Sequence, residues 1–216
     1  MQDPVISRRR LITGAAATLA TPALAQTRTR LPAMTDGPFY PPAAWRKRWE
    51  DWDADLTQTR RGSQTLQARG EALGLELSVA DSQGKIIDGA EVEIWQCDVL
   101  GSYRHPGVHD SASERDDGFQ GFGAARSGAD GALSFKTIKP VVYPGRTPHI
   151  HIKLRHAAFG EVTSQLFIAG DAGNARDGLW RSLSPAAQAA VAMRLEAGPA
   201  GSGLRWAVRQ MLVVPA

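Results

Sequence analysis

The stretch Leu73-Gly-Leu-Glu-Leu-Ser-Val79 carries a large apolar side chain at every second position. Successive side chains of a β-strand point to opposite faces, so this period of two predicts a half-buried strand. The turn signal Asp81-Ser-Gln-Gly84 follows, and the alternation resumes in Val92-Glu-Ile-Trp-Gln96. The chain also contains 22 glycines and 13 prolines, which favours many turns over a helical bundle.

Four further segments have the same strand-like character and are separated by loops rich in glycine and proline: residues 133–138, 149–154, 162–168 and 206–214. One helix is expected, with Ser184 as its N-cap, Pro185 at its first position and Gly198 as its stop. Short strands with frequent turns and one peripheral C-terminal helix predict an all-β fold, a two-sheet β-sandwich.

The 216 residues are expected to form one main domain with appendages. Residues 26–70 lack a clear period and hold Trp45, Trp49 and Trp52 among charged residues. We predict an irregular N-terminal arm over residues 26–70, packed by its aromatic side chains against a sandwich domain of residues 71–216.

The first 25 residues resemble a twin-arginine export signal. Ser7-Arg-Arg-Arg-Leu-Ile12 precedes a short apolar run, and Ala23-Leu-Ala25 has the small residues of a cleavage site. A disordered basic tail would explain the arginines but not this tripeptide. The apolar run is too short for a stable membrane anchor, so we expect cleavage after Ala25 and a periplasmic or secreted protein.

Charge and cysteine content exclude several classes of partner and site. The net charge is +3, and removal of residues 1–25 takes away three arginines and one aspartate, which leaves +1. A nearly neutral mature chain has no electrostatic basis for binding nucleic acid. Cys97 is the single cysteine, which excludes an intrachain disulfide and a zinc site built from cysteines.

The tripeptide His149-Ile-His151 is the first indication of chemistry. Residues i and i+2 of a strand share a face, so the two imidazoles should emerge together while Ile150, Ile152 and Leu154 face the core. Two imidazoles on a rigid strand are half of a metal site. Such pairs also occur on solvated strands, so the neighbouring loops decide the interpretation.

Two of the three tyrosines lie in loops rich in glycine and proline. Tyr103 lies in Gly101-Ser-Tyr-Arg-His-Pro106, and Tyr143 lies in Lys139-Pro-Val-Val-Tyr-Pro-Gly-Arg146. A surface tyrosine whose hydroxyl meets water is the alternative for each. A phenol has a pKa near ~10, so it needs a strongly polarising ion to be bound as phenolate. Two phenolates and two neutral imidazoles match Fe(III) acting as a Lewis acid.

In its motifs the chain resembles the intradiol ring-cleaving dioxygenases, the family of protocatechuate 3,4-, catechol 1,2- and hydroxyquinol 1,2-dioxygenases. The resemblance runs from about Thr35 to Asp171. It is carried by Thr35-Asp-Gly-Pro-Phe-Tyr40, Val92-Glu-Ile-Trp-Gln-Cys-Asp98, Gly101-Ser-Tyr-Arg-His-Pro106, Asp130-Gly131, Phe135-Lys-Thr-Ile-Lys-Pro140, Tyr143-Pro144 and Arg146-Thr-Pro-His-Ile-His151.

The resemblance implies a non-haem Fe(III) centre that cleaves a catechol-type diol with O2 to a cis,cis-muconate-type dicarboxylate. The implied metal ligands are Tyr103, Tyr143, His149 and His151. Tyr143 would be the tyrosinate that leaves the metal when the diol chelates it, and Arg146 would lie beside the substrate ring. Gln165, in Ser164-Gln-Leu-Phe-Ile-Ala-Gly-Asp171, matches a polar residue of the family's pocket.

The chain departs from the family pattern between Tyr143 and His149. Members that cleave protocatechuate or catechol carry a longer loop there with a tryptophan, whereas Gly145 occupies that place here. We therefore expect a more open site, in the short-loop form that resembles secreted members. All four implied ligands lie in this chain, so no ligand-bearing partner subunit is needed, and residues 172–216 are left for packing or a homo-oligomer surface.

Two alternatives from other classes stay open. One is a periplasmic, transthyretin-like sandwich that binds a metal or an aromatic compound without turnover, against which stands Arg146 in register with both histidines. The other is a non-oxidative metal hydrolase, against which stands the lack of a carboxylate at ligand spacing beside the histidines.

Overall fold

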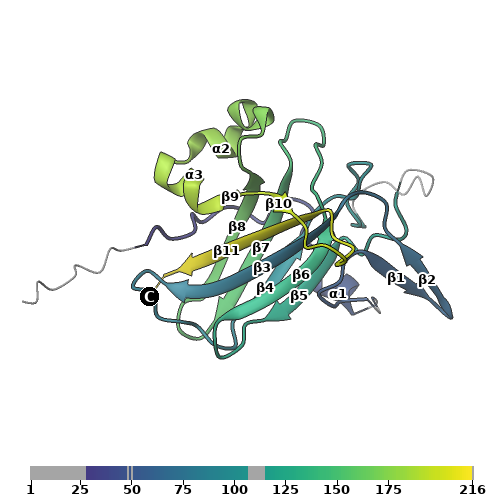
Figure 1. The fold of residues 1–216 in the computed structure, drawn as a ribbon, viewed down its shortest axis with the longest axis horizontal. Coiled ribbons are helices and arrows are strands. Elements are labelled where there is room, and N and C mark those ends of the chain that lie inside the picture. Colours follow the sequence, from purple (N-terminus) through teal and green to yellow (C-terminus); the bar gives the residue numbers. More distant parts are fainter. Residues whose placement is uncertain (1–27, 48, 50, 107–114, 216) are drawn as a thin grey trace, which may run out of the picture.

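The computed structural model describes residues 28–47, 49, 51–106 and 115–215, so the expected export signal lies outside the described residues. Two stacked β-sheets form the body of the molecule (Figure 1). The first sheet contains, in spatial order, β10 (Glu196–Ala197), β11 (Trp206–Val214), β3 (Ala72–Asp81) and β6 (Ala132–Ile138). The second sheet contains β5 (Phe122–Arg126), β4 (Glu91–Trp95), β7 (His149–His156), β8 (Gly160–Ile168) and β9 (Ala192–Met193).

The strand order joins distant parts of the chain. In the first sheet, β11 pairs parallel to β3, and β6 pairs antiparallel on the other side of β3. In the second sheet, β7 lies antiparallel between β4 and β8. Its register places His151 opposite Trp95 on one side and opposite Gln165 on the other. Three residues that are far apart in sequence therefore lie in one row across the second sheet.

The core lies between the two sheets. The alternating apolar residues of β3 are fully or almost fully buried there, as are Ile150, Ile152 and Leu154 of β7. At about 25 cal/mol per Å² of apolar surface, burial of this layer is the main force that holds the sheets together. The predicted β-sandwich is confirmed, and so is the core-facing side of the strand that carries the histidines.

The N-terminal arm is less irregular than expected. It contains α1 (Ala43–Arg46) and a hairpin of β1 (Gln58–Arg61) and β2 (Gln64–Gln67), with Gly62 at φ +59° in the turn. The prediction of an irregular segment is therefore wrong for these residues. The hairpin strands are polar and largely exposed, so they carry no apolar alternation that a sequence pattern could reveal.

The C-terminal helix begins as predicted but is shorter. In α3 (Pro185–Val191) the Ser184 hydroxyl accepts the Ala187 N–H, whereas the helix ends at Val191 and not near Gly198. The chain then adds β9 in parallel to β8, so tertiary pairing overrides helix propensity. Two unpredicted elements precede it, η1 (Ala172–Arg176) and α2 (Gly178–Ser182). Within the described ranges, no helix is long and apolar enough to cross a bilayer.

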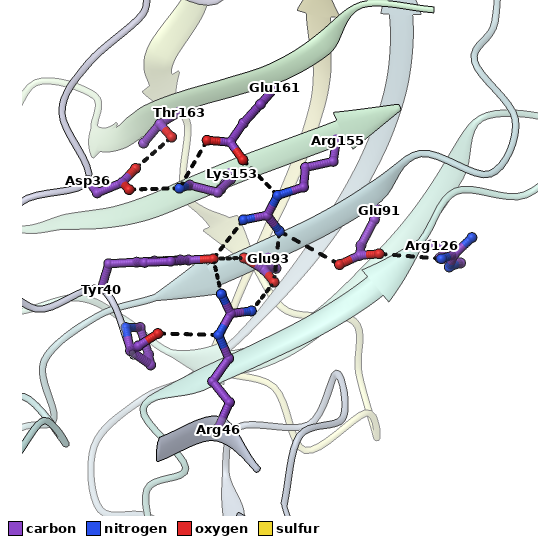
Figure 2. Close-up of polar contacts among 11 residues, drawn as sticks. Asp36, Tyr40, Arg46, Glu91, Glu93, Arg126, Lys153, Arg155, Glu161 and Thr163 are labelled. Carbon is purple, nitrogen blue, oxygen red and sulfur yellow. Dashed lines mark hydrogen bonds and ion pairs between the residues drawn. The ribbon is translucent and has the colours of Figure 1, made fainter. Parts of the chain in front are cut away.

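The outer face of the second sheet is polar, and residues of the arm make hydrogen bonds and ion pairs with it (Figure 2). Glu93 on β4 is 1% exposed and accepts a hydrogen bond from Tyr40 at 2.6 Å. It also pairs with Arg46 at 2.7 Å and Arg155 at 3.0 Å. We call the contacts among Asp36, Tyr40, Arg46, Glu93, Lys153 and Arg155 the arm-anchoring network.

The second half of this network joins the arm to β7. Lys153 is 3% exposed and donates to Asp36 on the arm at 2.7 Å. Its ammonium group also lies 4.1 Å from the centre of the Tyr40 ring. Burial, together with the hydrogen bond to Glu93, raises the pKa of Tyr40 to about 12, so this phenol stays neutral. The network therefore compensates buried charges of both signs at the place where the arm crosses the sheet.

We predict that Glu93→Ala destabilises the protein by about 3 kcal/mol, measured by urea unfolding. This loss of stability is at the low end of the range for breaking a buried ion pair. The side chains of Arg46 and Arg155 are 23% and 32% exposed, so water can solvate their charges once Glu93 is removed. Glu76→Ala is the matched control, since it breaks the exposed pair with Arg209 and should leave the midpoint unchanged. Equal effects of the two substitutions would contradict a structural role for the network.

Candidate metal centre

Two buried imidazoles stand side by side on β7. His149 and His151 are 1% and 2% exposed, and their Nε2 atoms are 3.3 Å apart. His149 Nδ1 lies 2.6 Å from the carbonyl oxygen of Thr147, which can only accept, so Nδ1 carries the proton. The Nε2 lone pair of His149 therefore points toward His151 and is available to a cation.

Tyr103 reaches the imidazoles from the loop after β4. Asp98 forms the turn of this loop, because its Oδ1 accepts the N–H groups of Leu100 at 2.9 Å and Ser102 at 3.0 Å. The tyrosine that follows is 4% exposed, and its hydroxyl lies 3.2 Å from His151 Nε2. One phenol oxygen and two imidazole nitrogens thus meet within hydrogen-bond distance.

Tyr143 approaches from the loop between β6 and β7. This loop closes tightly, with the Arg146 N–H donating to the Tyr143 carbonyl at 3.0 Å and Gly145 at φ +84°. The Tyr143 ring lies 5.4 Å from the ring of Tyr103 and 5.5 Å from that of His149. Its side chain is half-buried, which makes it the more accessible of the two tyrosines.

The two tyrosine loops touch at Gly101. A Cβ at this position would lie 3.2 Å from the Val142 carbonyl oxygen and 3.5 Å from Tyr143 Cβ. Gly101 also has φ +77°, which disfavours any side chain. The close approach of the loops therefore depends on glycine here.

Arg146 forms one side of the centre. Its Nη1 lies 3.5 Å from the Tyr143 hydroxyl, and its Nη2 donates to Gln165 Oε1 at 2.6 Å. Its Nε donates at 2.7 Å to Asp177, whose side chain is fully buried. Each of the three guanidinium nitrogens therefore has a different partner, and the positive charge is close enough to act on the pKa of both imidazoles.

Aromatic rings form the other walls. Trp95 stacks on His151 with ring centres 4.8 Å apart and planes 10° apart. Phe39, from the arm, stacks on Tyr103 at 4.4 Å. A Cβ on Gly37 would lie 3.4 Å from His151 Cε1, so the arm backbone runs directly against this imidazole. The arm thus lines the centre as well as covering the sheet.

Burial controls the protonation of the candidate ligands. Desolvation lowers the pKa of His149 to about 4 and that of His151 well below its usual range, with Arg146 adding to both effects. Desolvation also raises the pKa of Tyr103 well above 10. At neutral pH the imidazoles are therefore neutral and ready to bind a cation, while Tyr103 needs a highly charged ion to deprotonate it.

The structure brings together all six residues singled out from the sequence: Tyr103, Tyr143, Arg146, His149, His151 and Gln165. No group of three or more His, Cys, Asp or Glu side chains suited to a metal occurs in the part of the chain that the structure describes. The donor set here is imidazole and phenol, and the roles of these residues stay predictions.

Sequence reasoning missed Asp177, the stacking of Trp95 on His151 and the stacking of Phe39 on Tyr103. Trp95 is buried, and it packs against a candidate ligand. The local signal of Asp177 is only that of a helix N-cap, because Arg146 lies 31 residues away.

We predict that the metal-free protein loses stability as the pH falls from about 6.5 to about 4. Unfolded His149 protonates near its ordinary pKa of 6.5, whereas the folded protein protonates it near 4. Between these values the unfolded state binds more protons, so this residue alone should remove about 3 kcal/mol. Urea unfolding at a series of pH values in the presence of a chelator measures this slope. His149→Gln should make the slope shallower, with His151 accounting for part of what remains, and an unchanged slope in that variant would contradict the assignment.

Comparison with known proteins identifies the family. The sequence pattern of the family described as Dioxygenase matches residues 37–211. The protocatechuate 3,4-dioxygenase beta chain of Burkholderia cepacia is 32% identical over 144 residues, which cover 63% of this chain and 60% of the relative. The catechol 1,2-dioxygenase of Candida albicans is 27% identical over 42% of this chain and 34% of the relative. The chain therefore matches less than two thirds of the length of these relatives.

Solved structures agree on the fold. The dioxygenase domain of a dioxygenase and carbohydrate-binding protein fusion from Streptomyces sp. SirexAA-E has a TM-score of 0.62 at 25% identity and covers 87% of this chain and 99% of that domain. The 3-chlorocatechol 1,2-dioxygenase of Rhodococcus opacus 1CP has a TM-score of 0.65 at 16% identity, covering 88% of this chain and 74% of the other. By sequence pattern, by its relatives and by its β-sandwich, the chain belongs to the family of intradiol ring-cleaving dioxygenases.

Proposed function

We propose that this protein cleaves a catechol-type aromatic diol with O2 between the two hydroxyl-bearing carbons, to give a cis,cis-muconate-type dicarboxylate. The observation that carries this proposal is the convergence of two imidazoles and two phenols from three separate segments, in a chain of the intradiol family. Tyr103, Tyr143, His149 and His151 would hold a non-haem ferric ion.

The chemistry of the donor set fits a ferric ion. His149 Nε2 presents a lone pair to the centre, and the buried Nδ1 of His151 has no hydrogen-bond partner among the described residues. Two phenol oxygens supply hard anionic donors once deprotonated, which suits a trivalent ion better than zinc. When bound, Fe(III) supplies Lewis acidity that activates an electron-rich diol toward O2.

Residues of the chain would bind and orient the substrate. Arg146 is always cationic, and its Nη1 and Nη2 would stabilise negative charge that develops on the diol ring. Tyr143 is half-buried, and its phenolate oxygen, deprotonated as a ligand of the ferric ion, would accept a proton from one of the diol hydroxyls. The Phe39 and Trp95 rings wall the centre against water, which strengthens these electrostatic interactions.

The two alternative functions make different demands on the site. A metal hydrolase of the usual kind would place a carboxylate among the ligands, whereas the fully buried Asp177 is engaged by Arg146 and by backbone N–H groups. A binding module without turnover would not need a cation oriented by three partners. Metal analysis and oxygen uptake with catechol on one purified sample separate all three functions.

We predict that the purified protein binds one ferric ion per chain and is wine-red from tyrosinate-to-iron charge transfer. Tyr103→Phe should shift or bleach this absorption band, because it removes one of the two phenolates. His149→Ala and His151→Ala should lose the iron itself, measured by elemental analysis. A colourless protein that holds stoichiometric zinc and does not take up iron would contradict the ferric centre.

We predict that Arg146→Ala keeps iron and colour but lowers turnover by roughly 10²–10³-fold, since the arginine stabilises charge and is not a ligand. The wild-type product from catechol should be the colourless muconate and not the yellow semialdehyde of cleavage beside the diol. Chromatography of the product and stopped-flow kinetics measure these outcomes. Full activity of Arg146→Ala, or semialdehyde from the wild type, would show a different mechanism.

We further propose that the chain is exported in the folded state and cleaved after Ala25. The twin-arginine pathway carries folded proteins, which suits a metal inserted before export. Replacement of Arg8 and Arg9 by lysine should trap the precursor in the cytoplasm, as followed by fractionation and immunoblotting. An unchanged periplasmic yield in a strain that lacks the twin-arginine translocase would refute this route.

A further inference from the structure

Asp177 holds a fully buried carboxylate at the junction of η1 and α2. We propose that Asp177 is a positioning residue that orients Arg146 at the metal centre, and that the enzyme needs it for turnover through Arg146. This inference rests on the proposed function, in which Arg146 stabilises charge on the substrate. The hydrogen bonds of Asp177 go to the guanidinium Nε and to backbone N–H groups, and none of these donors belongs to a candidate ligand.

The carboxylate divides its two oxygens between two tasks. Its Oδ1 accepts the N–H groups of Leu179 and Trp180, both at 3.0 Å, and so caps α2. Its Oδ2 accepts Arg146 Nε at 2.7 Å and the Thr147 N–H at 3.1 Å. Four donors thus converge on one side chain. A serine or an asparagine would cap the helix equally well, because a cap needs one acceptor oxygen. The second oxygen serves the loop that carries Arg146.

This contact determines where the guanidinium points. The group is planar and rigid, so a bond that holds Nε, together with one that holds Nη2, fixes the plane and the direction of Nη1. Nη2 is held by Gln165 at 2.6 Å, and Nη1 then lies 3.5 Å from the Tyr143 hydroxyl. The arginine side chain is 18% exposed, so without Asp177 it has a route to solvent.

The charge state of Asp177 supports its role in orienting Arg146. Burial alone would raise the pKa of its carboxyl, but hydrogen bonds from Arg146 and from the N–H groups of Trp180 and Thr147 lower the pKa below its ordinary value. The residue is therefore an anion at neutral pH, and its bond to Arg146 is a charge-assisted one.

The test uses Asp177→Ser, which keeps an N-cap for α2 and removes the oxygen that holds Arg146. In crystals of the metal-free variant, we expect the guanidinium to leave Gln165 and Tyr143. A guanidinium in its original place would overturn the proposal, whether or not the protein turns over any diol. This readout therefore separates failure of the positioning role from failure of the proposed function.

The kinetic readout is a double-mutant cycle on the iron-loaded protein. Asp177→Ser should lower kcat by about 10–100-fold and shift the charge-transfer band, while iron content stays equal to that of the wild type. In an Arg146→Ala background the same substitution should cause no further loss, because its effect passes through the arginine. Losses that multiply in the double variant, or an unchanged kcat in Asp177→Ser, would overturn the inference.

Ser184→Ala is the matched control. It removes the N-cap of α3, the next helix along the chain, where the Ser184 hydroxyl accepts the Ala187 N–H at 3.2 Å. It should lower the thermal midpoint without changing kcat or the absorption band. If Ser184→Ala lowers kcat as much as Asp177→Ser does, the effect is one of general stability and the positioning role is refuted.

Discussion

The outer face of the second sheet must be both polar and buried, and the rest of the structure depends on how this conflict is resolved. On β7, the inward positions bury isoleucine and leucine, whereas the outward positions carry His149, His151 and Lys153. Buried polar groups are costly unless they are paired. The N-terminal arm supplies further partners, since Tyr40 reaches Glu93 on β4 and Asp36 reaches Lys153 on β7, in addition to the ion pairs between neighbouring strands. The arm therefore stabilises the second sheet and also lines the candidate metal centre.

The two ends of this face resolve the conflict differently. At one end, Glu93 lies between two arginines and Tyr40, so charge is compensated within the protein. At the other end, the buried Nδ1 of His151 has no hydrogen-bond partner among the described residues, so the imidazole pair is not fully satisfied within the protein. Trp95 separates the two ends, because it contacts Tyr40 at one edge and stacks on His151. Buried polar atoms that lack partners, next to a network in which all charges are paired, are characteristic of a binding site.

The sequence predicts those parts of the molecule that follow from local periodicity. The alternation of apolar residues in β3 and β7 predicts that both segments are strands and which of their faces packs in the core. It also predicts that His149 and His151 point in the same direction. Polar strands, such as those of the β1–β2 hairpin, carry no such signal. The sequence also did not predict that α3 ends at Val191. The helix ends there because the next residues pair as β9 with β8, which precedes the helix in the chain. Without the family resemblance, nothing local would have joined Tyr103 and Tyr143 to the histidines.

Long-range contacts also explain why Asp177 could not be found from the sequence. A single aspartate before a short helix predicts a cap, and the second use of its carboxylate appears only when the β6–β7 loop folds against it. Strand register also cannot be read from local sequence. The row of Trp95, His151 and Gln165 depends on how three strands align. The residues that touch a ligand can thus be read from motifs, whereas those that orient them depend on tertiary structure.

The pairing of Arg146 with Asp177 answers an electrostatic problem of the proposed centre. A guanidinium beside neutral imidazoles would, if alone, repel the trivalent cation that the site is proposed to hold. Asp177 is an anion at 2.7 Å, so the pair has almost no net charge at a distance while its N–H groups stay directed into the site. A lysine or an arginine without a carboxylate partner would add a full positive charge beside the proposed metal ion. The carboxylate would therefore allow a cationic hydrogen-bond donor and a ferric ion to lie close together in the proposed centre.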